Sequence, residues 1–293
     1  MHRIAVDGEF GHDSDNSARI HAMELTTIDY RVEGPIARVT LNRPQVLNTM
    51  NKAFWTEIID VFKAIDADPG VRVVLVASTG KHFTAGLDLG WAASVGGAEG
   101  DLGRAREAFR RHVKDMQESF SIVDRCRVPV ISVVQGGCIG GGVDFVTACD
   151  IRIATENAFF TIQEVNIAIV ADVGTLQRIP HLLPQGLVRE LAYTGRRFPA
   201  VEAKSYGFVN SVEADHDAAL QAGLTMAKLI AAKSPLVITG IKHVLNAGRD
   251  QSIEQGLDYV ALWNAGMLQG HDVPNAVQAQ IAKQVAVFDD LRG

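Results

Sequence analysis

The chain has 293 residues, of which 47% are hydrophobic and 21% are charged, a composition typical of a globular protein with one large or two moderate domains. A formal net charge of -6 argues against a nucleic-acid-binding protein, which normally presents a basic face. The three cysteines, Cys126, Cys138 and Cys149, form no CxxC pair and predict reduced thiols in the cytosol or a similarly reducing compartment. No apolar run in the sequence reaches the length of a membrane span.

The two ends of the sequence carry little targeting information. Residues 1–22 are polar and mildly acidic, unlike a signal peptide or a basic transit peptide, so we expect a flexible N-terminal tail. Met23 is an alternative start. The C-terminal "DLRG" is not a peroxisomal address, and the default expectation is therefore a cytoplasmic protein.

Strand and helix patterns alternate along the first two-thirds of the chain. "TTIDYRV" and "IARVTL" flank Gly34-Pro35 and predict a hairpin, and residues 51–68 carry the apolar face of a helix. Later strands are predicted at "VRVVLVAS", "PVISVV", "DIRIAT" and "AFFTI", with a long helix between the first two, from about Leu102 to Cys126. This alternation predicts an α/β fold with right-handed crossovers and a mainly parallel sheet.

From about Thr175 onward the pattern becomes almost wholly helical. The final stretch, "HDVPNAVQAQIAKQVAVFDDLRG", is expected to form one more helix with a charged end. The sheet is thus expected in the first two-thirds of the chain and a helical layer in the last third.

Two glycine-containing loops follow predicted buried strands. "FTAGLDL" contains Gly86, and "GGCIGGGVDF" contains a triple glycine and opens a helix that runs through Cys149. Glycines let a backbone approach a ligand closely, and a helix N-terminus favours negative charge. Neither loop has the spacing of a dinucleotide or Walker motif, and each alone fits an ordinary strand-to-helix turn. Together, the loops are suited to supply one N–H each to a single oxyanion.

Three acidic residues stand in or near apolar surroundings. "EVNIAIVADVG" sets Glu164 and Asp172 within an apolar segment, and buried carboxylates are paired, neutralised or used. Asp144 lies a few residues into the helix that follows the triple glycine. Taken singly, Asp144 fits a charge complement to a helix N-terminus and Asp172 fits a helix N-cap. Glu164 alone fits a buried ion pair with Arg178.

Four stretches of the chain carry a family resemblance: "RVTLNRPQVLNTMN", "FTAGLDL", "QGGCIGGGVDFVTACDIRIAT" and "AFFTIQEVNIAIVADVGTLQRIP". In this order and spacing they resemble the crotonase (enoyl-CoA hydratase/isomerase) superfamily, from about Met23 to the C-terminus. Within it, Asp144 after the triple glycine, then "QEV", then "ADVGTLQR" are most similar to the delta-3,5-delta-2,4-dienoyl-CoA isomerases.

This resemblance implies a crotonase (ClpP/crotonase-like) fold of repeated ββα units. It implies that residues 23–210 form the core for acyl-CoA binding and catalysis, and that residues 211–293 form a helical C-terminal region with trimer contacts. The expected assembly is a homotrimer, or a hexamer made as a dimer of trimers. Coenzyme A is then part of an acyl-CoA thioester substrate, and no other cofactor, metal, nucleic acid or membrane is expected.

The resemblance also assigns the site. The oxyanion donors are the backbone N–H groups of Leu87 and Gly141, and the acidic trio maps onto Asp144, Glu164 and Asp172. The residues expected to bind substrate are Ala85, Gly86, Leu87, Asp88, Leu89 and Gly141.

Moving both double bonds of a 3,5-dienoyl-CoA to give the 2,4-dienoyl-CoA requires proton removal at C2 and proton delivery at C6. We assign Glu164 to C2, Asp172 to C6 and Asp144 to tuning the pair. These roles are exchangeable, because coupled carboxylates titrate as a set.

Other functions explain fewer of these residues. An enoyl-CoA hydratase holds one water between two glutamates, but this chain has the shorter Asp144 at one position and an additional Asp172. A simple enoyl-CoA isomerase needs one carboxylate, and a non-catalytic scaffold or RNA-associated protein needs none. One departure is Asn166, where the family often has Asp, and it puts the acidity of Glu164 or the acyl-chain preference in doubt.

Overall fold

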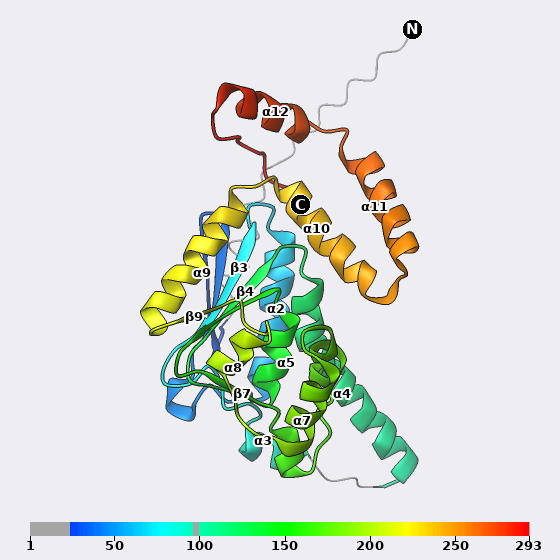
Figure 1. The fold of residues 1–293 in the computed structure, drawn as a ribbon. Coiled ribbons are helices and arrows are strands. Elements are labelled where there is room, and N and C mark those ends of the chain that lie inside the picture. The colour runs from blue at the N-terminus through cyan, green and yellow to red at the C-terminus, as the bar shows by residue number, and fades with distance from the viewer. Residues whose placement is uncertain (1–23, 96–99, 293) are drawn as a thin grey trace.

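The computed structural model describes residues 24–95 and 100–292, and its largest feature is a six-stranded sheet (Figure 1). The strand order is β1-β2-β3-β4-β6-β9. The first two strands are antiparallel and every later neighbour is parallel, which confirms the mainly parallel sheet. The strands are β1 (Ile28–Glu33), β2 (Ile36–Leu41), β3 (Val73–Ser78), β4 (Val130–Val134), β6 (Ile151–Thr155) and β9 (Ser211–Glu213).

The hairpin predicted around Gly34 is confirmed, with Glu33 paired to Ile36 across the turn. Gly34 has a φ of 57°, a left-handed conformation that favours glycine. Strands β3 and β4 are buried along their whole length. Continuous apolar runs of this kind are typical of parallel strands covered on both faces.

Helices cover both faces of the large sheet (Figure 1). One face packs against α2 (Lys52–Ala67), α4 (Leu102–Arg125) and α5 (Gly141–Ala148), whose aromatic rings Phe54, Phe120 and Phe145 contact one another. The other face is covered by α9 (His216–Ala231). A Cβ at Gly223 of α9 would lie 2.9 Å from side-chain atoms of both Leu75 and Val133, so the absence of a side chain lets this helix lie close to the strands.

A second sheet of three short strands lies beside the first: β5 (Gly137–Ile139), β7 (Phe159–Thr161) and β8 (Phe198–Pro199). The sequence predicted β7 correctly, but it predicted that "GGCIGGG" opens a helix directly, and this is wrong for its first half. Residues Gly137–Ile139 pair with β7, and only at Gly141 does α5 begin. A three-residue strand has no period of its own, so this pairing depends on contacts that are remote in sequence.

Short helices complete the core: η1 (Pro44–Val46), α3 (Leu89–Val95), η2 (Glu164–Ile167), α6 (Thr175–Arg178), η3 (Ile179–His181), α7 (Gln185–Thr194) and α8 (Ala200–Ser205). The predicted N-terminal tail, residues 1–22, lies outside the described residues. Among residues 24–95 and 100–292 no single helix is long and apolar enough to cross a membrane, although α9 and the next helix, which are bent by 106°, meet that test as a pair.

Four helices follow α9 in the described part of the chain, and the last two extend away from the sheets (Figure 1). They are α10 (Pro235–Ala247), η4 (Gly248–Asp250), α11 (Ile253–Met267) and α12 (Asp272–Ala282). The almost wholly helical last third is confirmed apart from β8 and β9, but the final predicted helix ends early. Lys283 takes the left-handed conformation that closes α12, and the Arg72 guanidinium then binds the Phe288 carbonyl at 2.7 Å and holds the tail in a non-helical path.

Candidate active site

The first glycine loop presents one unused amide. The N–H of Gly86 donates to Thr84 Oγ1 at 3.0 Å. The N–H of Asp88 donates to the carbonyl of Met50 at 3.1 Å. Between them, the N–H of Leu87 has no hydrogen-bond acceptor within residues 24–95 and 100–292. The Leu87 N–H, which the family resemblance assigned to an oxyanion, is therefore available to a ligand.

The second glycine loop places a helix N-terminus against the first loop. Gly141 is the first residue of α5, so its N–H has no partner within the helix. A Cβ at Gly86, whose φ is 81°, would lie 2.5 Å from the Ile139 carbonyl oxygen and 3.5 Å from the Gly141 nitrogen. The two loops thus touch through their backbones at Gly86, directly before Leu87, and at Ile139 to Gly141.

Asp144 lies in the first turn of α5 and is completely buried. Its Oδ1 accepts a hydrogen bond from the Thr175 N–H at 2.5 Å, and its Oδ2 has no partner among the described residues. Burial raises the pKa of Asp144 to about 6, while the hydroxyl and amide of Thr175 and the charge of Arg178 act in the opposite direction. The residue does more than complement a helix end, because its carboxylate contacts a second segment of the chain.

Glu164 begins η2, immediately beyond the small sheet. A Cβ at Gly140 would lie 3.2 Å from its Oε1, so the carboxylate lies against the second glycine loop. Its Oε2 is buried and has no partner in the described part of the chain. Burial, together with the charges of Asp144 and Asp172, raises the pKa of Glu164 to about 7.

The alternative ion pair between Glu164 and Arg178 does not form. Arg178 instead pairs with Asp124 of α4, with 3.4 Å between Nε and Oδ2. Glu164 is therefore a half-buried carboxylate whose charged neighbours are two other acids.

Asp172 lies in the turn before α6 and is half-buried, and burial raises its pKa. Its backbone carbonyl accepts a hydrogen bond from Gln117 Nε2 of α4 at 2.7 Å. The alternative role as a helix N-cap is not observed, because the capping position of α6 is Gly174 and no side chain caps that helix. The side chain of Asp172 is therefore not occupied by a cap.

The structure brings the three predicted acids together. Asp172 raises the pKa of both Asp144 and Glu164, and Asp144 raises that of Glu164, so all three lie within electrostatic range. Glu164 also lies against Gly140, which directly precedes Gly141, whose N–H donates to no acceptor in residues 24–95 and 100–292. Three carboxyls beside two amide donors can move protons next to a stabilised oxyanion.

The remaining predicted substrate contacts, Ala85, Gly86, Asp88 and Leu89, are less uniform. Ala85 is half-buried and Gly86 is buried in the loop. The Asp88 carboxylate accepts hydrogen bonds from the Trp91 N–H and the Thr49 hydroxyl, both at 3.2 Å, and so caps the start of α3. Leu89 is 61% exposed. The acid of Asp88 thus stabilises its own turn, and the part of Leu89 that faces solvent is available for contact.

Four neighbours of the site were not found from the sequence. Met50 and Trp55 lie beneath Gly141, where a Cβ would meet the Met50 sulfur at 2.9 Å and the Trp55 ring at 3.9 Å. Gln117 and Thr175 hold Asp172 and Asp144 respectively. Thr175 lies inside the stretch "ADVGTLQR", but nothing in one sequence distinguishes it from an ordinary helix start.

Comparison with known proteins identifies relatives of the chain. The family described as Enoyl-CoA hydratase/isomerase matches residues 31–290. The chain is 42% identical over 270 residues to the peroxisomal Delta(3,5)-Delta(2,4)-dienoyl-CoA isomerase of Arabidopsis thaliana, which covers 91% of this chain and 97% of that protein. It is 44% identical over 247 residues to the mitochondrial Delta(3,5)-Delta(2,4)-dienoyl-CoA isomerase of Homo sapiens, which covers 83% of this chain and 75% of that protein.

A similar solved structure is the crystal structure of an enoyl-CoA hydratase from Bacillus anthracis. The two structures superpose with a TM-score of 0.82, and the two sequences are 29% identical. The match covers 90% of this chain and 99% of the chain from Bacillus anthracis. The predicted crotonase fold is therefore confirmed, whereas the trimerising role of the C-terminal region stays a prediction.

The relatives correct one expectation. The cytoplasmic location predicted from the two termini is wrong by this comparison, because the names of the relatives from Arabidopsis thaliana and Homo sapiens place them in peroxisomes and mitochondria. Reduced cysteines do not distinguish the cytosol from other reducing compartments, and organelle addresses are read by receptors rather than written in overall composition.

Proposed function

Because the chain belongs to the enoyl-CoA hydratase/isomerase family, we propose that it isomerises 3,5-dienoyl-CoA to 2,4-dienoyl-CoA in fatty-acid β-oxidation. The observation that carries this proposal is the gathering of three acids, Asp144, Glu164 and Asp172, beside two free backbone donors. Two relatives at 42% and 44% identity bear the name of this activity. Coenzyme A is part of the substrate, and the reaction as proposed uses no further cofactor.

The thioester carbonyl would lie between the two glycine loops. Loss of a proton from C2 puts negative charge on this oxygen, and the N–H groups of Leu87 and Gly141 would each donate a hydrogen bond to it. A donor of this kind contributes about 2.7–4 kcal/mol to transition-state stabilisation. The free state of both amides and the contact between their loops support this role.

Glu164 would be the base at C2. Its pKa of about 7 leaves a substantial ionised fraction near neutral pH and makes the carboxylate a better proton acceptor than an exposed one. The electron pair of the broken C–H bond would spread onto the thioester oxygen and, in the other direction, along the diene to C6. Burial and the negative charge of Asp144 both produce the raised pKa, so Asp144 would act by tuning the base.

Asp172 would complete the shift by giving a proton to C6. As the C6–H bond forms, the double bonds settle at C2 and C4, and the oxyanion returns to a thioester carbonyl. Glu164 then releases its proton to solvent and Asp172 takes one up from solvent, so that the starting state is restored. Burial favours the protonated form of Asp172, as a donor requires, and its side chain caps no helix.

Hydration of a 2-enoyl-CoA is the second candidate. The observation in its favour is that Asp144 Oδ2 and Glu164 Oε2 are both buried without a partner in the described residues, and two such oxygens suit one shared water. A hydration mechanism does not use the side chain of Asp172, however. An ultraviolet assay separates the two: 3,5-dienoyl-CoA yields the conjugated 2,4-dienoyl product if the proposal holds, while hydration of 2-enoyl-CoA without dienoyl turnover would contradict it.

The proposed assembly is a homotrimer, or a hexamer of two trimers, in which residues 211–293 supply subunit contacts. Neither α11 nor α12 has a buried residue. An apolar hollow lies between α10, α11 and the final tail, lined by residues that include Leu236, Val260 and Trp263. Sedimentation velocity tests the assembly directly, and a monomer at micromolar concentration would contradict it.

A further inference from the structure

One carboxylate joins the C-terminal helices to the proposed acid site. Asp124, at the end of α4, pairs with Arg178 of α6 through 3.4 Å and with Arg249 of η4 through 2.9 Å. The Asp124 and Arg178 side chains are only 18% and 13% exposed, so solvent screens their interaction less than it screens a surface pair.

On the site side, Arg178 lies under the turn that carries Asp172. Its Nη2 donates to Ser121 Oγ of α4 at 3.3 Å, and its Nη1 lies 3.5 Å from the Val173 carbonyl. A Cβ at Gly174 would lie 1.8 Å from Nη1, so the guanidinium rests directly on the backbone there. The Arg178 side chain thus contacts the backbone directly before Thr175, whose amide holds Asp144.

On the C-terminal side, two groups from the end of α10 and from η4 hold the end of α4. Arg249 Nη1 donates to both oxygens of Asp124 at 2.9 Å. Asn246 Nδ2 donates to the Asp124 carbonyl, also at 2.9 Å. The position of α10 against the core therefore decides whether Asp124 is held in place to receive Arg178.

We propose that Asp124 is a positioning residue through which the seating of α10 sets the geometry of the acid-bearing turn, residues 172–175. The effect of this coupling on turnover rests on the proposed function, whereas the coupling itself is a property of the free protein. Arg178 transmits it, because it contacts both Asp124 and the Gly174 backbone.

Hydrogen exchange measured by mass spectrometry tests the coupling without substrate, on the full chain. Arg249→Gln removes the ion pair between η4 and the Asp124 carboxylate, and exchange in peptides covering residues 172–178 is expected to accelerate roughly threefold to tenfold. Arg72→Gln is the matched control, because Arg72 binds the Ala231 and Phe288 carbonyls and Asp290 but not α4. It is expected to change exchange only near residues 231 and 288–290.

Unchanged exchange at residues 172–178 in Arg249→Gln, or an equal acceleration there in Arg72→Gln, would overturn the proposal. Arg249→Lys keeps the cation and is expected to restore slow exchange; failure to do so would also contradict a role through charge. With 3,5-dienoyl-CoA, Arg249→Gln should lower kcat while the dissociation constant of an unreactive acyl-CoA stays unchanged. Absence of turnover in the unmodified protein would refute the proposed function and leave the exchange result to decide the coupling.

Discussion

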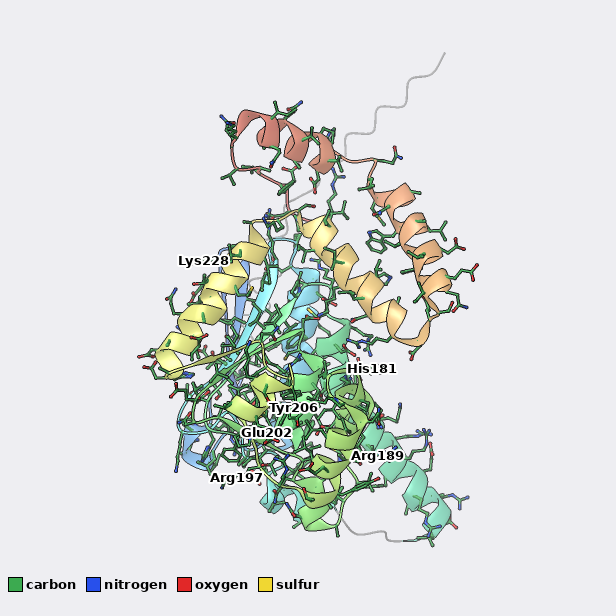
Figure 2. All side chains as sticks on the ribbon, viewed as in Figure 1. His181, Arg189, Arg197, Glu202, Tyr206 and Lys228 are labelled. Atoms are coloured by element: carbon green, nitrogen blue, oxygen red, sulfur yellow. The ribbon has the colours of Figure 1, made fainter. Side chains whose placement is uncertain are left out.

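The sheet core and the C-terminal helices bury their apolar residues very differently. In the core, side chains crowd between the sheets and their helices, whereas on α11 and α12 they stand apart (Figure 2). Phe120 and Phe145 are fully buried, while Ile253 and Ile281 are 85% and 79% exposed. Dense packing therefore supports the proposed site in the core, whereas α11 and α12 have the exposed apolar surface expected of a region that packs against another chain.

The largest expected loss of activity follows from replacing the proposed base in the core. Glu164→Gln should lower dienoyl isomerisation about 10²–10⁴-fold, because a positioned base contributes a factor of that size. Exchange of the C2 proton with deuterated solvent should fail in the same variant. Undiminished exchange would show that another residue removes this proton. Glu156→Gln, in an exposed turn after β6, is the control.

The next effect tests the contact between the two glycine loops. Gly86→Ala should destabilise the fold by about 1–3 kcal/mol and abolish turnover, because the new Cβ would lie 2.5 Å from the Ile139 carbonyl oxygen. Gly207→Ala is a matched control, since Gly207 has a similar φ of 79° but no neighbour within 4 Å. Thermal denaturation of both variants separates backbone strain from loop contact. Equal losses would mean that close approach of the loops is unimportant.

A third change concerns the C-terminal region alone. The double variant Ile253→Ser and Leu257→Ser should dissociate the proposed trimer, since these side chains of α11 are 85% and 64% exposed in one chain. The stability of the separate subunit should change by less than about 0.5 kcal/mol, as for other exposed positions. Sedimentation velocity reports the assembly, with Val32→Ser on β1 as the control. A trimer that persists would place the subunit contacts elsewhere.

The smallest effect is a pH dependence of stability in the core. The pKa of Glu164 is raised from 4.5 to about 7 in the folded chain, so the unfolded chain loses its proton first and the free energy of unfolding falls as pH rises between these values. Glutamine does not titrate, so the free energy of unfolding of Glu164→Gln does not fall for this reason. Its melting temperature should therefore exceed that of the unmodified protein by about 2–4 °C at pH 8 and by less at pH 4. A constant difference across this range would contradict the buried position of the carboxyl.

The long strands and helices of the core were predictable from the sequence, whereas its short strands were not. Continuous apolar runs such as Val73–Ser78 and the capped helix Lys52–Ala67 carry their own periodic pattern, so both were predicted. Strands β5, β8 and β9 have two or three residues each and exist only because remote segments pair with them. The path of the tail after α12 is likewise fixed by a remote residue, Arg72, which binds the Phe288 carbonyl.

Part of the candidate site was likewise predictable from the sequence, and part was not. Family resemblance located Asp144, Glu164 and Asp172, since their order and spacing are visible in one dimension. It gave no sign that Thr175 and Gln117 hold two of these acids, because those hydrogen bonds join residues 31 and 55 positions apart. Contacts of that range are created by the fold and have no local pattern.

The most direct test of the account asks whether Asp172 delivers the proton at C6. In deuterated water, the unmodified protein should turn 3,5-dienoyl-CoA into 2,4-dienoyl-CoA that carries deuterium at C6, as read by mass spectrometry. Asp172→Asn should lose about 10²–10⁴-fold of this turnover and still bind an acyl-CoA with an unchanged dissociation constant. Equal formation of the C6-deuterated product by Asp172→Asn would contradict the account.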